Sequence, residues 1–233
     1  MRTPSLLSVP PSRIVRPSRL PMPSRSVIGS NPASSASYST SFPLTENPVS
    51  EGGLWTPGGT TGLDWQDPRT TAGKAYASAT SAGYNDCVAC LSGYPANHSA
   101  QVTIYQDATY TAPDSHEVEL LLRFKISANV ARGYEITLGN AGTTIQVFAW
   151  HGSIGDVFPE LSGTGAGPGG LVTGDVVKAQ AVGNVITVYK NGSLIYTVTD
   201  SQYSDGGPGM GFFVRPGGTP DRYCITQFTA AGL

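Results

Sequence analysis

Glu117 and Glu119 are the residues of this sequence whose spacing comes nearest to a catalytic pair. They flank Val118, so in a β-strand both carboxyl groups project from the same face. Two carboxyl groups about 5 Å apart on one face are what a retaining glycoside hydrolase needs. Arg123 and Lys125 fall on that same face, and a strand face of charged residues is typical of a surface in contact with water. We therefore interpret this face as solvated and not as a catalytic site.

Aromatic and polar residues elsewhere could bind a sugar. A carbohydrate site needs an aromatic platform around which hydrogen-bonding groups converge, and Trp150, His151, Asp156 and Trp65 could supply one. The alternative is a tryptophan that fills the gap between two sheets. The sequence has only three histidines and contains no phosphate-binding loop, nucleophile elbow or HExxH motif. These features favour a protein without catalytic activity.

The three cysteines indicate buried thiols more than a redox or metal site. Cys87 and Cys90 have CxxC spacing, but their neighbours indicate a strand between turns and not the helix start that activates a redox thiol. A zinc site would need a fourth ligand and a second close pair, and only Cys224 remains. A disulfide, either between Cys90 and Cys224 or between subunits, is the alternative.

Length and composition indicate one large β-domain. The 233 residues include 29 glycines and 18 prolines, which suit many turns and few helices. No apolar run approaches the roughly 20 residues of a membrane-spanning helix, so no membrane partner is expected. The formal net charge is −2, but residues 1–45 hold five arginines and no acid. The rest of the chain is therefore acidic, with a formal charge of −7.

Residues 1–37 are predicted to form an extended arm and linker. The tripeptide Pro-Ser-Arg recurs with a period of six residues and ends at Arg13, Arg19 and Arg25. Polyproline II geometry, with three residues per turn, places these arginines along one edge together with Arg16. A disordered tail is the alternative. No apolar stretch typical of a secretion signal follows the first residues, so we expect synthesis in the cytoplasm without such a signal.

Residues 38–233 are predicted to form one antiparallel domain. Its clearest part is a meander of three strands, Val176–Val182, Val185–Lys190 and Ser193–Asp200, which are rich in Val, Ile, Tyr and Thr. Asn191-Gly192 joins the last two strands, and this dipeptide tolerates the positive φ that both central positions of a type I′ turn require.

The central strand is expected at Glu117–Ser127, where apolar residues alternate on one face that contacts the core: Val118, Leu120, Leu122, Phe124 and Ile126. Both faces of 144–150 are apolar, so something beyond the core must cover or use the second face. Further strands are expected at 38–43, 62–65, 74–80, 86–92, 101–105, 133–139, 209–215 and 222–229. Many short strands without a helix predict an all-β, two-sheet antiparallel sandwich.

A series of short motifs runs through residues 38–233: Tyr38-x-x-x-Phe42, Gly52-Gly53-x-Trp55, GYEI at 133–136, Trp150-x-Gly152, Gly174-Asp175, the hairpin at 184–200 and Gly207-Pro208-Gly209-x-Gly211-Phe212. In this order they resemble the concanavalin A-like lectin/glucanase superfamily in its laminin-G-like form. The resemblance implies a jelly roll of two curved sheets, with loops around a concave side that can hold a ligand. Hydrolases of that superfamily carry an acid-x-acid-x-acid series on one strand, and Glu117 and Glu119 lack its third acid.

We expect no cofactor, but the resemblance implies that the domain could instead bind calcium. Laminin-G-like domains often hold calcium through loop carboxylates. Four aspartates lie in turns where this could happen, but no spacing singles any of them out: Asp86, Asp175, Asp200 and Asp205.

Together these observations favour a non-catalytic structural or adhesion protein. We expect a lectin-like jelly roll displayed on a larger extracellular assembly and anchored by its arm, such as a virion decoration, fibre-base or collar protein of a tailed phage. Its expected partners are a viral capsid or tail and further copies of itself. A carbohydrate-binding lectin or receptor-binding module is the alternative, and a polysaccharide lyase or glycoside hydrolase is the third. Nucleic acid is not expected, because five arginines without interleaved aromatic residues offer little phosphate neutralisation or stacking.

Overall fold

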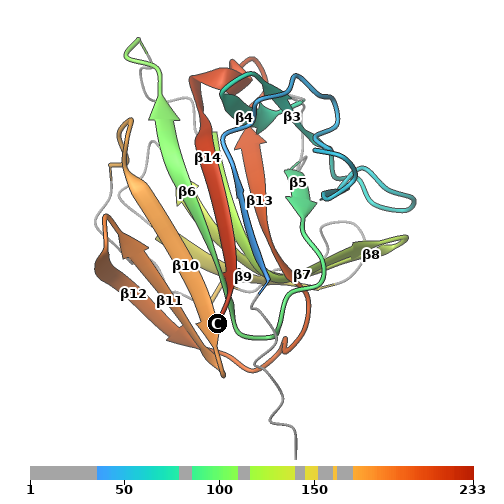
Figure 1. Ribbon diagram of the computed structural model, residues 1–233, viewed down its shortest axis with the longest axis vertical. Coiled ribbons are helices and arrows are strands. Elements are labelled where there is room, and N and C mark those ends of the chain that lie inside the picture. Colours follow the sequence, from blue (N-terminus) through green and yellow to red (C-terminus); the bar gives the residue numbers. More distant parts are fainter. Residues whose placement is uncertain (1–35, 79–85, 110–115, 140–144, 152–159, 162–169) are drawn as a thin grey trace, which may run out of the picture. The chain divides into compact units, whose positions relative to one another are not determined.

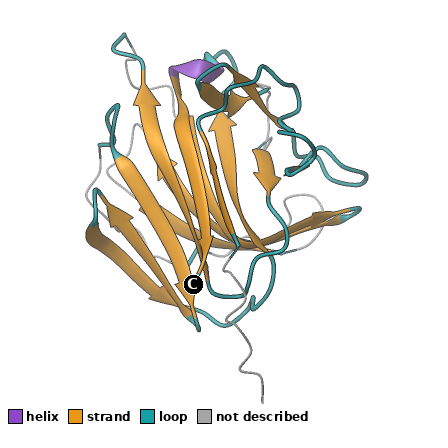
Figure 2. Ribbon diagram, in the orientation of Figure 1, coloured by secondary structure: helices purple, strands orange, loops and turns teal. Residues whose placement is uncertain are grey.

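The computed structural model describes residues 36–78, 86–109, 116–139, 145–151, 160–161 and 170–233 (Figure 1). Within these ranges the chain is built of β-strands and one short 3-10 helix, η1 (Pro220–Arg222), as Figure 2 shows. No helix in them is long and apolar enough to span a membrane. The predicted all-β class is confirmed.

One sheet has the strand order β12-β11-β10-β6-β14-β4-β3, and β1 also pairs with β14. Every pairing between its strands is antiparallel. Its strands are β1 (Ser37–Thr40), β3 (Pro68–Thr71), β4 (Lys74–Ala77), β6 (His98–Gln106), β10 (Val176–Val182), β11 (Val185–Lys190), β12 (Ser193–Thr199) and β14 (Tyr223–Gly232). The meander expected from the sequence is thus β10–β11–β12. Its Asn191-Gly192 turn has the positive φ values of 51° and 81° that the sequence required.

The other sheet has the order β2-β5-β13-β7-β8-β9, with all of these pairings antiparallel. Its strands are β2 (Thr56–Pro57), β5 (Cys87–Cys90), β7 (His116–Ser127), β8 (Val130–Gly139), β9 (Ile145–Trp150) and β13 (Gly207–Val214). The strand predicted at 62–65 is wrong: these residues form a turn and an irregular segment. Trp65 in this segment packs on the six-stranded sheet instead of adding a strand to it.

The main core lies between the two sheets. Alternate residues of β7, including Leu120 and Leu122, pack with alternate residues of β10 such as Val177 and Ala179 in one buried apolar cluster. Burial of these side chains removes apolar surface from water, which is the principal driving force for such a sandwich. The face of the six-stranded sheet that points away from this core is called the outer face below.

A β-bulge divides the central strand β7 into two halves. The register with β8 shifts between Leu122 and Lys125, and Arg123 has a φ of +50°. A one-residue shift reverses which face each later side chain occupies. Leu122 therefore points into the main core, whereas Phe124 and Ile126 belong to a second cluster on the outer face. The expected single apolar face is correct only for the half of β7 before the bulge.

Candidate functional site

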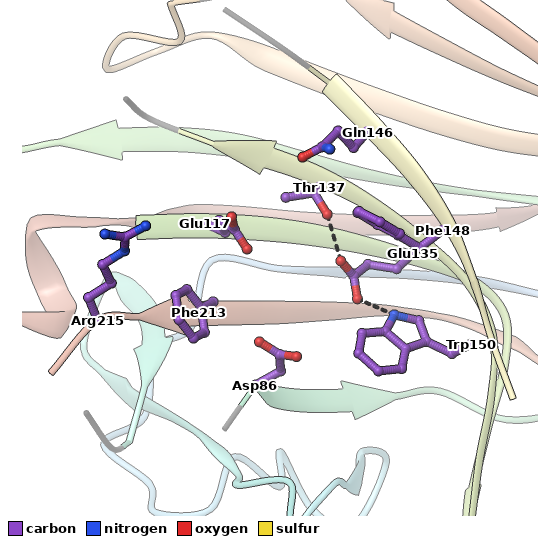
Figure 3. Close-up of a pocket in the computed structure, with 9 residues that line it drawn as sticks. All are labelled: Asp86, Glu117, Glu135, Thr137, Gln146, Phe148, Trp150, Phe213 and Arg215. Atoms are coloured by element: carbon purple, nitrogen blue, oxygen red, sulfur yellow. Dashed lines mark hydrogen bonds between the residues drawn. The ribbon is translucent and has the colours of Figure 1, made fainter. Parts of the chain in front are cut away.

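A pocket of about 270 Å³ opens on the outer face of the six-stranded sheet. Its size is near the lower end of the range for small-molecule sites. Figure 3 shows its lining, which comes from four strands and the residues next to them: Asp86, Glu117, Glu135, Thr137, Gln146, Phe148, Trp150, Phe213 and Arg215. Three of these side chains are carboxylic acids and three are aromatic.

The pairing of β7 with β8 brings acids from two strands together. Glu135 of β8 lies opposite Leu121, at the position where a third alternating acid would continue the series from Glu117 and Glu119. Thr137, two residues further along β8, lies opposite Glu119. Residues separated by two along a strand share one face, so these acidic side chains gather on the outer face. The sequence of β7 alone conceals this, because its neighbour supplies the third carboxyl group.

Glu119 is completely buried beside the pocket. It lies between Thr137 of β8 and Gly211 of β13. A Cβ atom added to Gly211 would lie 2.1 Å from the Oε2 atom of Glu119, so the absence of a side chain at Gly211 makes room for this carboxyl group. Neither carboxyl oxygen has a hydrogen-bond partner among the described residues.

Hydrogen bonds hold the side chain of Glu135 in place at the edge of the pocket. The Thr137 hydroxyl donates to Oε1 over 2.6 Å, and the Trp150 indole N–H donates to Oε2, as the dashed lines in Figure 3 mark. Burial raises the pKa of Glu135 to about 7, although both hydrogen bonds oppose this shift. Burial and repulsion from Glu135 likewise raise the pKa of Glu117 to about 7, against the opposing effect of Arg215.

The other two acids also resist ionisation. Burial is the main cause that raises the pKa of Asp86 well above its usual value, followed by repulsion from Glu135 and Glu117. The pKa of Glu119 is raised in the same way by burial and then by Glu135 and Asp86. The four groups therefore form one cluster in which each carboxylate makes the next harder to ionise.

Aromatic residues pack together on another part of the outer face. Trp65 packs edge-to-face against Trp150, with ring centroids 4.9 Å apart, and also lies against Phe124. Trp65 and Trp150 are 2% and 5% exposed. This packing closes one end of the outer face, and the second apolar face of β9 is used as expected, since Trp150 belongs to this cluster and Phe148 packs against it.

The structure brings together only part of the predicted sugar site. Trp150 lines the pocket, but Trp65 is buried and offers no open platform. His151 is not part of the pocket lining; its ring contacts the side-chain amide of Gln202, 3.1 Å from Nδ1. Asp156 lies outside the described residues, as do the arm residues Arg13, Arg16, Arg19 and Arg25.

The prediction of a solvated charged face on β7 is wrong. Glu119 and Arg123 are 0% and 2% exposed, and only Lys125 lies in the open, next to Asp205. The physical reason is that Glu119 is enclosed between β8 and β13, where Gly211 leaves room for it. Arg123 lies at the bulge and bonds to backbone carbonyls of three loops. A signal was available in the GYEI motif, because its glutamate interrupts an otherwise apolar strand and is Glu135.

The disulfide proposed between Cys90 and Cys224 is absent, and all three cysteines are buried free thiols. Cys90 belongs to the outer cluster of the six-stranded sheet, whereas Cys224 lies on β14 of the other sheet. Packed sheets are about 10 Å apart, which exceeds the Cα separation that a disulfide spans. Burial raises the pKa of Cys90 and of Cys224 to about 12.

The turn aspartates considered for calcium have partners within the chain or belong to the acidic cluster. Asp175 accepts from the Asn191 amide and pairs with Lys190, and Asp200 accepts from the Tyr134 hydroxyl over 2.6 Å. Asp205 pairs with Lys125 and Arg132, and Asp86 lines the pocket. Among the described residues no group of three or more potential ligands is placed to hold a metal ion.

No protein-family model and no curated protein matches the sequence. Solved structures do match the fold. The β-glucanase of Bacillus licheniformis is 15% identical, with 87% of this chain and 100% of that chain covered and a TM-score of 0.53. The exoplasmic/lumenal domain of VIP36, in its Ca2+/Man3GlcNAc-bound form, is 11% identical, with 80% and 86% covered and a TM-score of 0.53.

A carbohydrate-binding module, CBM66 from Bacillus subtilis, is 15% identical, with 72% of this chain and 96% of that chain covered and a TM-score of 0.50. At such identities the likeness establishes the fold alone. The chain has the jelly-roll fold of the concanavalin A-like lectins and glucanases, as the order of its motifs implied. These structures bear on neither a laminin-G-like subtype nor a phage origin.

Proposed function

We propose that this domain binds a carbohydrate in the pocket on the outer face of the six-stranded sheet. The observation that carries this proposal is the composition of the pocket wall. Phe148, Trp150 and Phe213 offer apolar surface for the C–H face of a sugar ring, while Glu117 and Gln146 offer hydrogen-bonding groups for its hydroxyls. Sites of this kind combine a largely apolar lining with a few polar groups that fix orientation.

The comparisons support the same ligand class. The three structures are a carbohydrate-binding module, a β-glucanase and a domain bound to Man3GlcNAc. Fold likeness on its own is an analogy, and the pocket on this chain supplies an independent reason. We therefore place carbohydrate binding ahead of the structural role expected from the sequence.

Binding is testable with a glycan array followed by calorimetry on the glycans that it identifies. Gln146→Ala removes one hydrogen-bonding group from the pocket, so we expect the affinity to fall about tenfold, the usual cost of one or two lost hydrogen bonds. Gln101→Ala is the matched control, because Gln101 lines a separate pocket on the eight-stranded sheet with Lys178 and Tyr189. If only Gln101→Ala weakens binding, the ligand occupies the other sheet. An array without any signal contradicts the proposal.

Glycoside hydrolysis is a second candidate function. It is favoured by one observation: Glu117 and Glu135 share a pocket, and both have a pKa raised to about 7. A carboxylic acid that stays protonated near neutral pH can act as the general acid, and a second carboxylate can act as nucleophile or base. A non-catalytic role, as expected from the sequence, is the alternative proposal to hydrolysis.

Measuring the release of reducing ends from the bound glycan distinguishes hydrolysis from binding alone. A hydrolase should act best near pH 7, where one acid is protonated while its partner is ionised. Glu117→Gln and Glu135→Gln should each reduce the rate by a factor of at least ~100 while binding persists. Binding without product release at any pH, by the unsubstituted chain, supports the non-catalytic role.

Three expectations stay predictions from the sequence: display on a virion or other extracellular assembly, anchorage by residues 1–37, and assembly into several copies. Residues 1–35, which include the repeated arginines, lie outside the described part of the chain. A carbohydrate-binding jelly roll is compatible with such a location, since a displayed domain must meet its ligand at a surface.

A further inference from the structure

The pocket has an excess of acidic groups over basic ones. Asp86, Glu117 and Glu135 line it and Glu119 lies beside them, whereas Arg215 is the one basic residue among the described residues of the lining. No ion pair among the described residues involves any of the four acids; the pairs present join other side chains. In Figure 3 the three lining carboxyl groups point toward a common space bounded by Phe213 and Trp150.

Glu119 supplies a second observation that points to a ligand at this site. Its side chain is fully buried, both its oxygens lack hydrogen-bond partners among the described residues, and it is held over the bare backbone of Gly211. A buried carboxyl group without a partner costs free energy. A cation bound nearby would favour the ionised form of this carboxyl group and give it a partner.

The aromatic wall suits a cation carried on a sugar. Phe148 and Trp150 of β9 and Phe213 of β13 border the same space as the acids. Aromatic faces attract an ammonium group as well as the C–H face of a sugar ring. A simple metal ion would use none of this apolar surface, and the acids are not arranged as metal ligands.

We infer that the glycan held in this pocket is a cationic one, built of hexosamine units with free, protonated amino groups. This inference rests on the proposed carbohydrate binding and names its ligand class. The ammonium group lies among Asp86, Glu117 and Glu135 and supplies the counter-charge that the fold leaves out. An acidic sugar such as a uronate is repelled by the same groups.

Three oligosaccharides that share one backbone test the inference: glucosamine oligomers, N-acetylglucosamine oligomers and cello-oligosaccharides, which differ only in the substituent at carbon two. At about pH 6 the amino group is protonated, and calorimetry should show the glucosamine oligomer binding at least ~10-fold more tightly than the other two. Its binding should also release about one proton per site, because an ammonium group favours ionisation of Glu117 or Glu135, which the free protein keeps protonated at this pH. Titration in two buffers of different ionisation enthalpy measures this proton.

Glu117→Gln is the decisive variant, because Glu117 lies partly exposed in the pocket and the substitution keeps its shape. It should remove most of the preference for the free amine and the proton release. Asp221→Asn removes the same charge from exposed η1 and should change neither. Equal weakening by both variants means diffuse attraction to an acidic domain and overturns the inference. Equal affinity for the three oligomers also overturns it while leaving carbohydrate binding intact, and failure of every glycan to bind refutes the proposed function itself.

Discussion

Glu119 and Arg123 lie four residues apart on β7, and both are ionisable side chains buried within the fold. Arg123 is fully partnered: Nε donates to the Ala96 carbonyl over 2.9 Å, Nη1 to Tyr203 over 2.8 Å and Nη2 to Gly183 over 2.6 Å. Glu119 has no such partner among the described residues. One strand thus carries a buried ionisable side chain with partners at its bulge and another without partners before the bulge.

The difference separates a structural role from a functional one. The three carbonyls that Arg123 binds belong to connections between β5 and β6, between β10 and β11, and between β12 and β13. Arg123 therefore ties loops of both sheets to the central strand, which explains its conformation at the bulge. Glu119 ties nothing together, and its position beside the pocket points to interaction with a ligand.

The largest effect that we expect is on Arg123. Arg123→Met keeps an apolar stem but leaves three backbone carbonyls without their donor, and each unsatisfied buried group costs about 1–3 kcal/mol. We expect the free energy of unfolding to fall by about 3–5 kcal/mol, as when one partner of a buried charged network is removed. Urea denaturation followed by tryptophan fluorescence measures this change.

Lys125→Met is the matched control for this prediction. Lys125 follows Arg123 on β7 by two residues, but its side chain is 47% exposed and pairs with Asp205 at the surface. Exposed pairs contribute little to stability, so the change should stay within about 0.5 kcal/mol. If both variants lost similar amounts of unfolding free energy, the hydrogen bonds of Arg123 would contribute no more to stability than a surface contact.

Much of the fold could be predicted because its signals are local. The Asn191-Gly192 turn and the alternation in β10, β11 and β12 lie within one stretch of sequence, and each element is recognisable from its own residues. Apolar residues alternate along β8 in the same way, and Tyr134, Ile136 and Leu138 all face the core.

The bulge and the acidic pocket could not be predicted because they depend on contacts between distant residues. Nothing in the alternation of β7 shows that the register shifts after Leu122. The acids at Asp86, Glu119 and Glu135 come from segments far apart in the sequence, and only strand pairing brings them together. The charged residues at alternating positions of β7 therefore predicted a face in contact with solvent, whereas the fold forms a pocket there.

The last prediction concerns Glu119, which unlike Arg123 has no hydrogen-bond partner among the described residues. An unfolded glutamate ionises near pH 4.3, whereas Glu119 has a pKa well above its usual value and Glu117 and Glu135 have values of about 7. Between about pH 5 and 7 the folded chain keeps protons that the unfolded chain has released, so its stability falls as the pH rises, by up to about 1.4 kcal/mol per pH unit for each retained proton. Glu119→Gln should reduce this slope by about 1 kcal/mol per pH unit.

Urea midpoints at several pH values measure the slope for both chains. Above pH 7 the contributions of Glu117 and Glu135 level off because both become ionised. Asp221→Asn, at an exposed site, should keep the original slope. A Glu119→Gln variant with an unchanged slope would mean that Glu119 is ionised in the folded state, and it would then need a cationic partner as Arg123 needs its carbonyls.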